Sequence, residues 1–88
     1  MKTILAVMAY KTANGKSVSR TYLELFQNYD DVLEVVSYWI ETFDPKNMEA
    51  KDKLFQIALD LIRGCGKPVY DIALKDKEYN IRIKIEEL

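Results

Sequence analysis

Residues 69–86, VYDIALKDKEYNIRIKIE, decide the fold because apolar and polar residues alternate on both sides of a charged turn. After the turn, the apolar side chains are expected to point inward: Tyr79, Ile81, Ile83 and Ile85. The polar side chains between them are expected to point outward: Asn80, Arg82, Lys84 and Glu86. Successive side chains of a strand point to opposite faces of a sheet. The pattern therefore predicts a β-hairpin with one buried and one solvated face, its strands at 69–75 and 78–86.

A second hairpin is expected at the other end of the chain. Residues 3–12 are apolar on both faces, which favours a central strand. Asn14-Gly15 is the residue pair that a tight type I′ turn prefers. Residues 17–26 then return as a strand with no cleanly apolar face, which indicates a position near the edge of the sheet.

Two helices are expected between the hairpins. The first spans 28–45, capped by Asn28 or Asp30 and ended by Pro45, and the second starts at Asp44-Pro45 or Asn47 and ends at Gly64. The first helix has an apolar stripe at helical spacing: Val32, Val35, Val36, Trp39, Ile40 and Phe43. The predicted stripe of the second is Leu54, Phe55, Ala58, Leu61 and Ile62, broadened by Ile57 and Leu59.

The element order is therefore ββααββ, in a single α+β domain over residues 1–88. The simplest packing has two layers: a four-stranded antiparallel sheet of two β-hairpins, with an antiparallel helix pair on one face. The other face would stay open and partly apolar, because the first strand has two apolar sides. Such a face is commonly an interface, so a homodimer is one alternative.

The residues that most enzymes and metal sites need are scarce. The chain has no histidine and one cysteine, Cys65, so no zinc site or intramolecular disulfide is expected. A Cys65 nucleophile would lack an imidazole base, and Asn14-Gly15-Lys16-Ser17 lacks the upstream glycine and following helix of a phosphate-binding loop. We predict no enzyme and no cofactor. A cytoplasmic, reducing compartment is expected because the chain cannot form an intramolecular disulfide, and no membrane span is expected because no apolar run approaches about 20 residues.

Acidic residues gather in the middle of the chain. Residues 29–60 hold eight acidic and three basic side chains, whereas residues 1–28 hold one acidic and four basic ones. The first helix is predicted to bind a partner through one side that carries Asp30, Glu34, Tyr38, Glu41 and Asp44. The alternative is the ordinary solvated face of an amphipathic helix.

A basic and aromatic set on the strands is the other candidate surface. Arg20, Tyr22, Arg82 and Lys84 could hold single-stranded nucleic acid on the open sheet face. The alternatives are a protein-binding surface and plain decoration that keeps edge strands soluble. The net charge of −1 argues against a duplex-DNA binder.

The leading hypothesis is a small non-enzymatic regulator or inhibitor. It would bind a larger protein, such as a nucleic-acid enzyme, through the acidic helical surface. Antitoxins and phage anti-defence proteins of the anti-CRISPR type have a similar size and a similar separation of charge. The comparison is an analogy and does not rest on a shared motif. Single-stranded nucleic-acid binding through the sheet is the alternative function.

Overall fold

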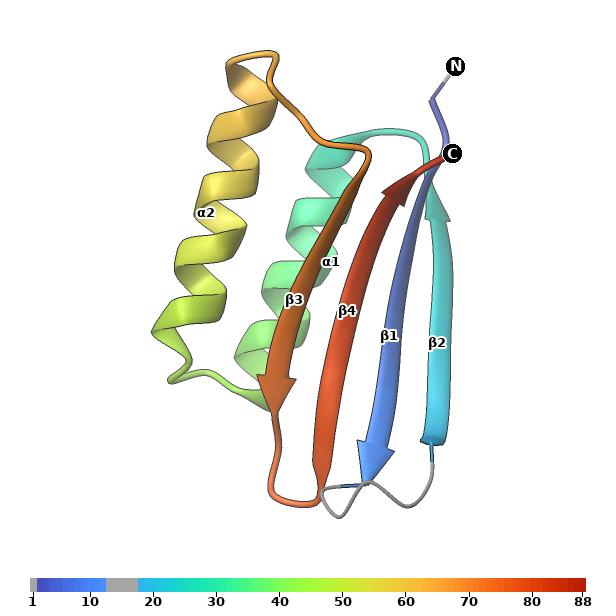
Figure 1. Cartoon of the computed structure of the whole chain (residues 1–88), viewed down its shortest axis with the longest axis vertical. Helices are drawn as coiled ribbons and strands as arrows, with labels where there is room; N and C mark the ends of the chain where they lie inside the picture. Colours follow the sequence, from blue (N-terminus) through green and yellow to red (C-terminus); the bar gives the residue numbers. More distant parts are fainter. Residues whose placement is uncertain (1, 13–17) are drawn as a thin grey trace.

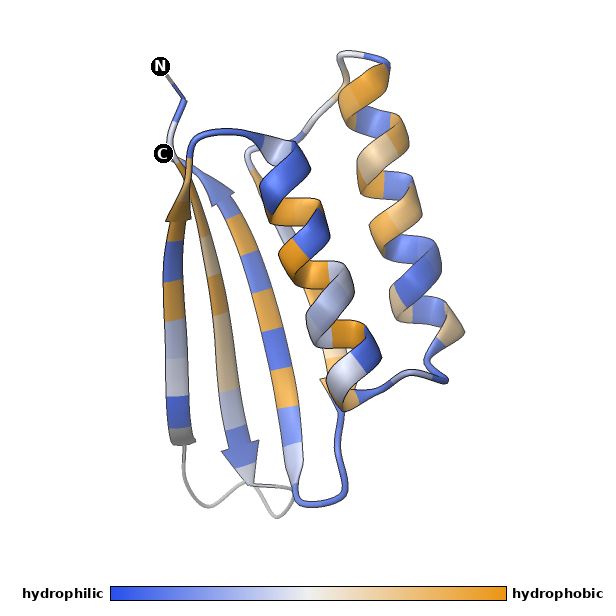
Figure 2. Cartoon of the chain, turned by 180° about the vertical axis from the view of Figure 1, so that it is seen from behind, coloured by the Kyte–Doolittle hydropathy of each residue, from blue (hydrophilic) through white to orange (hydrophobic). Residues whose placement is uncertain are grey.

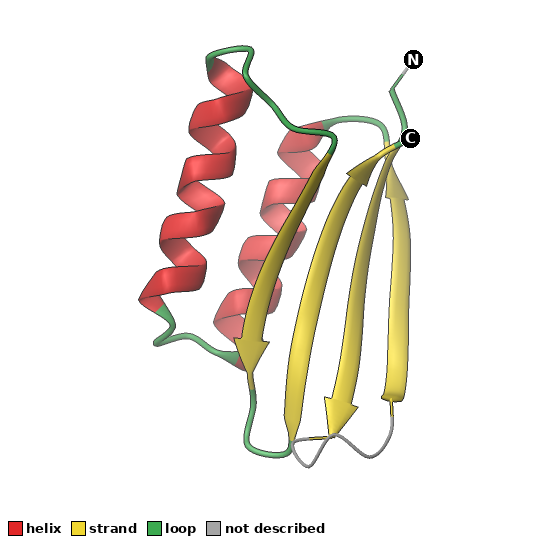
Figure 3. Cartoon of the chain, in the orientation of Figure 1, coloured by secondary structure: helices red, strands yellow, loops and turns green. Residues whose placement is uncertain are grey.

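The computed structural model describes residues 2–12 and 18–88, so the predicted Asn14-Gly15 turn lies outside the described residues. Figures 1 and 3 show one sheet with two helices behind it. The elements follow the predicted order ββααββ: β1 Ile4–Thr12, β2 Val18–Phe26, α1 Tyr29–Phe43, α2 Met48–Ile62, β3 Val69–Lys75 and β4 Tyr79–Glu87. The predicted fold class is confirmed.

The two hairpins join through their first and last strands. The sheet order is β2-β1-β4-β3, and every neighbouring pair is antiparallel. β1 pairs with β4 along its whole length, from Ile4 opposite Glu87 to Thr12 opposite Tyr79. β1 is thus central and β2 lies at an edge, as their apolar patterns predict.

The core lies between the sheet and the helices. Buried and exposed residues alternate along β3 and β4, and Figure 2 shows hydrophobic and hydrophilic residues alternating along the strands. The most deeply buried large side chains of the sheet are Ile4 of β1, Ile72 of β3, and Ile81, Ile83 and Ile85 of β4. α1 contributes Val32, Val36, Trp39 and Ile40, and α2 contributes Ala50 and Ile57. Burial of these apolar side chains is the main force that holds the two layers together.

Asparagine side chains start both helices. The Asn28 side-chain oxygen accepts a hydrogen bond from the Asp31 backbone N–H at 2.9 Å, and the Asn47 oxygen accepts one from the Ala50 N–H at 2.9 Å. Each bond satisfies a backbone donor that has no partner within the helix. α2 ends at Ile62, and Gly64 follows two residues later with a φ of +72°, a left-handed conformation that glycine adopts without strain.

The predicted buried stripe of α2 is partly wrong. Phe55 and Ile62 are 65% and 81% exposed, whereas Ala50, outside the predicted stripe, is buried with Ile57. Leu54 and Leu61 are partly buried against the core, as predicted. α2 carries apolar residues on more than one side, so periodicity alone did not select the side that meets β3 and α1.

A hydrogen bond ties the start of α1 to the last strand. The Tyr29 hydroxyl donates to Glu87 Oε2 at 3.1 Å, and Glu87 also pairs with Lys2 at 3.4 Å. Burial first, and then the neighbouring Glu87 carboxylate, raise the pKa of Tyr29 from its ordinary 10.0 to about 12. The folded protein therefore favours the neutral phenol.

We expect the Tyr29→Phe variant to lose less stability at high pH than the wild type loses. The raised pKa of Tyr29 contributes stability that is fully present below pH 10.0 and is lost as the pH rises through about 12. Urea unfolding at roughly pH 9 and pH 11.5 would measure this loss. Tyr38→Phe, at an exposed position of the same helix, is the matched control and should follow the wild type. Equal losses in Tyr29→Phe and the wild type would contradict the prediction.

Candidate functional site

The outer side of α1 is acidic and lacks compensating charge within the helix. Its residues include Asp30, Asp31, Glu34 and Glu41, and neither lysine nor arginine occurs between Tyr29 and Phe43. All four acidic side chains are exposed. Asp30 and Asp31 lie in the first turn, where the positive end of the helix dipole favours carboxylates. The sequence predicts this surface, and the structure brings its residues to one side of the molecule.

Two of these carboxylates have neither an ion pair nor a side-chain hydrogen bond within the part of the chain that the structure describes. Glu41 pairs with Lys51 Nζ of α2 at 3.0 Å, and Asp31 accepts a hydrogen bond from Asn28 Nδ2 at 3.0 Å. Among the described residues, neither Asp30 nor Glu34 takes part in an ion pair. Their negative charge is therefore available to a partner.

Asp44, the last member of the predicted acidic set, bonds within the fold instead. Its Oδ2 accepts hydrogen bonds from Asn47 Nδ2 at 2.8 Å and from the Lys75 backbone N–H of β3 at 3.0 Å. Asn47 Nδ2 also approaches the Ala73 carbonyl oxygen at 3.4 Å. The α1–α2 connection thus bonds to the C-terminal end of the outer edge of β3, and Asp44 has a structural role that sequence spacing did not reveal.

Tyr38 lies at the border between α1 and the edge strand β2. It is 66% exposed and lines a hollow of about 340 Å³ with Phe26, Asp31, Glu34 and Val35. An exposed tyrosine beside carboxylates is a common feature of protein-binding surfaces, because the ring contributes contact area at a low cost in conformational entropy.

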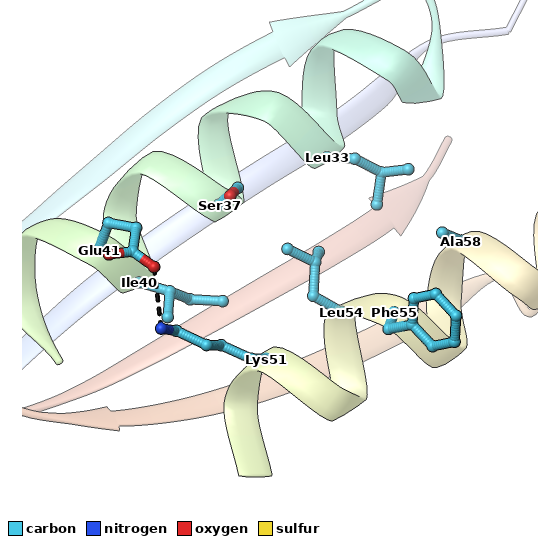
Figure 4. A pocket seen from close by; sticks show the side chains of 8 residues that line it. All are labelled: Leu33, Ser37, Ile40, Glu41, Lys51, Leu54, Phe55 and Ala58. Carbon is cyan, nitrogen blue, oxygen red and sulfur yellow. Dashed lines mark ion pairs between the residues drawn. The ribbon is translucent and has the colours of Figure 1, made fainter. Parts of the chain in front are cut away.

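An apolar groove runs between the two helices, beside the acidic residues. Figure 4 shows its lining side chains, with the ion pair between Lys51 and Glu41 at one end. The groove has a volume of about 350 Å³ and is lined by Leu33, Ser37, Ile40 and Glu41 from α1, and by Lys51, Leu54, Phe55 and Ala58 from α2. Its walls are chiefly apolar, so it can accept an apolar side chain of a partner.

Phe55 is the residue of this groove that sequence analysis assigned wrongly. It was predicted to be buried, yet 65% of it is exposed. The sequence did contain a signal for the exposure of Phe55, because Met48, Phe55 and Ile62 recur every seven residues. All three are more than 60% exposed. Seven residues are about two helical turns, so this spacing forms a stripe of its own, opposite the buried one.

We group these residues of α1 and α2 as one candidate site, which we call the helix-layer surface. It consists of the acidic residues and tyrosine of α1 together with the groove and its exposed phenylalanine: Asp30, Glu34, Tyr38, Glu41, Leu33, Leu54 and Phe55. An apolar centre with a charged rim is the usual composition of a transient protein–protein interface.

The predicted sheet-face set is divided between two faces, which corrects its predicted grouping. Tyr22 pairs with Met8 and Arg20 with Tyr10, on the side that carries the helices, and the Tyr22 ring lies 5.7 Å from Trp39. Arg82 and Lys84 alternate with the buried Ile81 and Ile83 and point away from the helices. A strand shows which residues share a face, but the register with β1 decides which face that is.

Tyr22 has an acidic neighbour rather than a basic one. Its hydroxyl donates to Glu24 Oε2 at 3.3 Å, and the charge of Glu24, with smaller effects of burial and of this hydrogen bond, raises the pKa of Tyr22. On the open face, Lys84 lies 3.5 Å from Glu86 in an ion pair. Of the three predicted cations, Arg20 therefore lies on the opposite face from the other two, and Lys84 is paired with Glu86.

Other kinds of site find little support in the described part of the chain. Cys65 is exposed, and its Sγ approaches only the Arg63 carbonyl oxygen, at 3.6 Å. Over residues 2–12 and 18–88, no group of three metal-binding side chains comes together. No helix within these ranges has the length and apolar character to cross a bilayer. Comparisons with protein-family models, with curated proteins and with solved structures found no match.

Proposed function

We propose that this protein is a non-enzymatic inhibitor or regulator that binds a larger protein through the helix-layer surface. The observation that carries the proposal is the pairing of free carboxylates on α1 with an apolar groove that leaves Phe55 exposed. A partner that complements it would offer a basic surface with an apolar side chain near its centre. Nucleic-acid enzymes have basic surfaces of this kind, because they bind phosphates.

The charge of α1 and the apolar contact of Phe55 would contribute to partner binding in different ways. The carboxylates from Asp30 to Glu41 extend over about 16 Å of α1, at about 1.5 Å per residue. Their field would speed the encounter with a positively charged partner. Burial of Phe55 would contribute roughly 1.5–3 kcal/mol, which would slow dissociation. Occupation of the partner's phosphate-binding surface would then block its nucleic acid.

We expect the double variant Glu34→Lys and Glu41→Lys to weaken partner binding by at least about tenfold, because it reverses the charge of the rim. Proteins that co-purify with the tagged chain from its native cells would be identified by mass spectrometry, and the affinity of each would be measured by calorimetry at two salt concentrations. The matched control, Asp71→Lys with Glu78→Lys, makes the same charge change on β3 and in the β3–β4 turn. It should change the affinity by less than about twofold.

Phe55→Ala separates the apolar contribution from the charge. We expect it to raise the dissociation rate and to leave the salt dependence unchanged, because the side chain carries no charge. Full affinity in both the charge-reversed variant and Phe55→Ala would reject the helix-layer surface. Salt-dependent binding of a labelled single-stranded oligonucleotide, lost in Arg82→Glu with Lys84→Glu, would favour the nucleic-acid alternative instead.

A further inference from the structure

The two outer edges of the sheet differ in how they are covered. On β3, the side chains of Asp44 and Asn47 bond to the Lys75 N–H and approach the Ala73 carbonyl oxygen. On β2, no side chain of the described residues bonds to the outer backbone, and Figure 1 shows no element beside that strand. An edge strand with unpaired N–H and C=O groups is a template for a further strand.

The middle of β2 is complementary to itself in the antiparallel direction. β2 spans Val18–Phe26, so Tyr22 is its central residue. When two copies pair antiparallel about this centre, Arg20 of each copy lies opposite Glu24 of the other, and Thr21 lies opposite Leu23. Side chains directly opposite in such a pair are about 4.5–5.5 Å apart at Cβ, so the two opposite-charge pairs stabilise this register.

We propose that two copies of this protein associate through their β2 edges, in this register, to form one continuous antiparallel sheet. The dimer does not rest on the proposed binding of a larger protein. It rests on the outer position of β2 in the sheet and on the charge complementarity between Arg20 and Glu24, whereas the other outer strand, β3, is bonded by side chains at its end.

Two other symmetric registers are less favourable for the same electrostatic reason. A pair centred on Arg20 would place the two arginines opposite each other, and one centred on Glu24 would place the two glutamates opposite each other. The irregular pairing of β2 with β1 lies beyond Arg20, where Lys11 meets Val18, so residues 20–24 keep a regular ladder. The outer edge of β3 is bonded only at its end, at Ala73 and Lys75, so β2 is favoured over β3 by the charge complementarity of Arg20 and Glu24.

The arrangement has a consequence for the exposed side chains of β2. The two-fold axis is perpendicular to the sheet, so both helix layers lie on the same side. Tyr22, 46% exposed and in contact with Trp39, meets Tyr22 of the second copy at the axis. On the opposite side, Leu23 and Leu25, 60% and 62% exposed, extend the apolar surface that β1 begins with Leu5 and Val7.

Analytical ultracentrifugation of the purified chain over a concentration series tests the proposal. We expect a monomer–dimer equilibrium for the wild type. Arg20→Glu alone and Glu24→Arg alone each place two pairs of like charges opposite each other, and each should weaken the dimer by at least about tenfold. The double variant Arg20→Glu with Glu24→Arg restores opposite charges and should dimerise like the wild type.

Mixing the two single variants gives a sharper readout. The Arg20→Glu variant has glutamate at both positions 20 and 24, and the Glu24→Arg variant has arginine at both. The mixture should therefore form a heterodimer, although each variant alone stays largely monomeric. Asp71→Lys on β3 is the control and should leave the equilibrium unchanged. A wild type that stays monomeric throughout the series, or a dimer insensitive to both single reversals, would overturn the proposal. Circular dichroism of each variant confirms that it is folded.

Discussion

Ile57→Ala is expected to lower the free energy of unfolding by about 3 kcal/mol. Ile57 is 1% exposed and lies on the side of α2 that faces the core. Truncation to alanine removes buried apolar contacts and leaves a cavity that the neighbouring strands cannot fully close. Since domains of this size are typically stable by only about 5–15 kcal/mol, the shift in the urea midpoint should be large.

Phe55→Ala is the matched control on the same helix, two residues away. Phe55 is 65% exposed, so we expect its truncation to change the free energy of unfolding by less than about 1 kcal/mol. The pair of variants thus reports which side of α2 meets the sheet. A larger loss for Phe55→Ala than for Ile57→Ala would mean that α2 packs as its sequence pattern first indicated, and Phe55 would then be unavailable to a partner.

Asp44→Ala is expected to cost about 2 kcal/mol of stability, measured by the same urea unfolding. The substitution leaves the Lys75 N–H without its carboxylate acceptor and removes the group that holds the Asn47 side chain in its capping position. Hydrogen bonds to charged groups contribute more than neutral ones, and the cap of α2 depends on the same asparagine.

Asp30→Ala is the control, because it removes another carboxylate of the predicted acidic set. Asp30 is exposed in the first turn of α1, where a carboxylate contributes about 0.3–1 kcal/mol through the helix dipole. We therefore expect a smaller loss of stability than for Asp44→Ala. Equal losses would show that Asp44 has no special role in the connection between the helices and β3.

Most of the fold could be predicted because its signals are local. The alternation in Tyr79–Glu87, the two apolar faces of Ile4–Thr12 and the caps Asn28 and Asn47 each involve residues close in sequence. The central place of β1 in the sheet was also predicted from its two apolar faces, although the helices cover only the face of Ile4, Ala6 and Met8 and leave Leu5 and Val7 half-buried. Four of the five predicted acidic-site residues also share an exposed surface, because helical spacing determines which residues of α1 lie together.

The remaining features depend on contacts between segments far apart in the chain. Phe55 and Ile57 are both apolar, and only the position of α2 beside β3 decides which of them is buried. Asp44 resembles a surface carboxylate until β3 brings the Lys75 N–H within 3.0 Å of it. Arg20 and Tyr22 share a face of β2 in any register, but the pairing with β1 turns that face toward the helices.

The sequence by itself determined the order of the helices and strands, their bounds to within about two residues, and which residues share a face of each. These properties follow from backbone periodicity and from side chains that cap nearby backbone groups. The tertiary structure decided which face is buried, which sheet edge is covered and which carboxylates are free. Those properties depend on long-range packing, because burial and hydrogen bonding between elements select one orientation among several that local pattern permits.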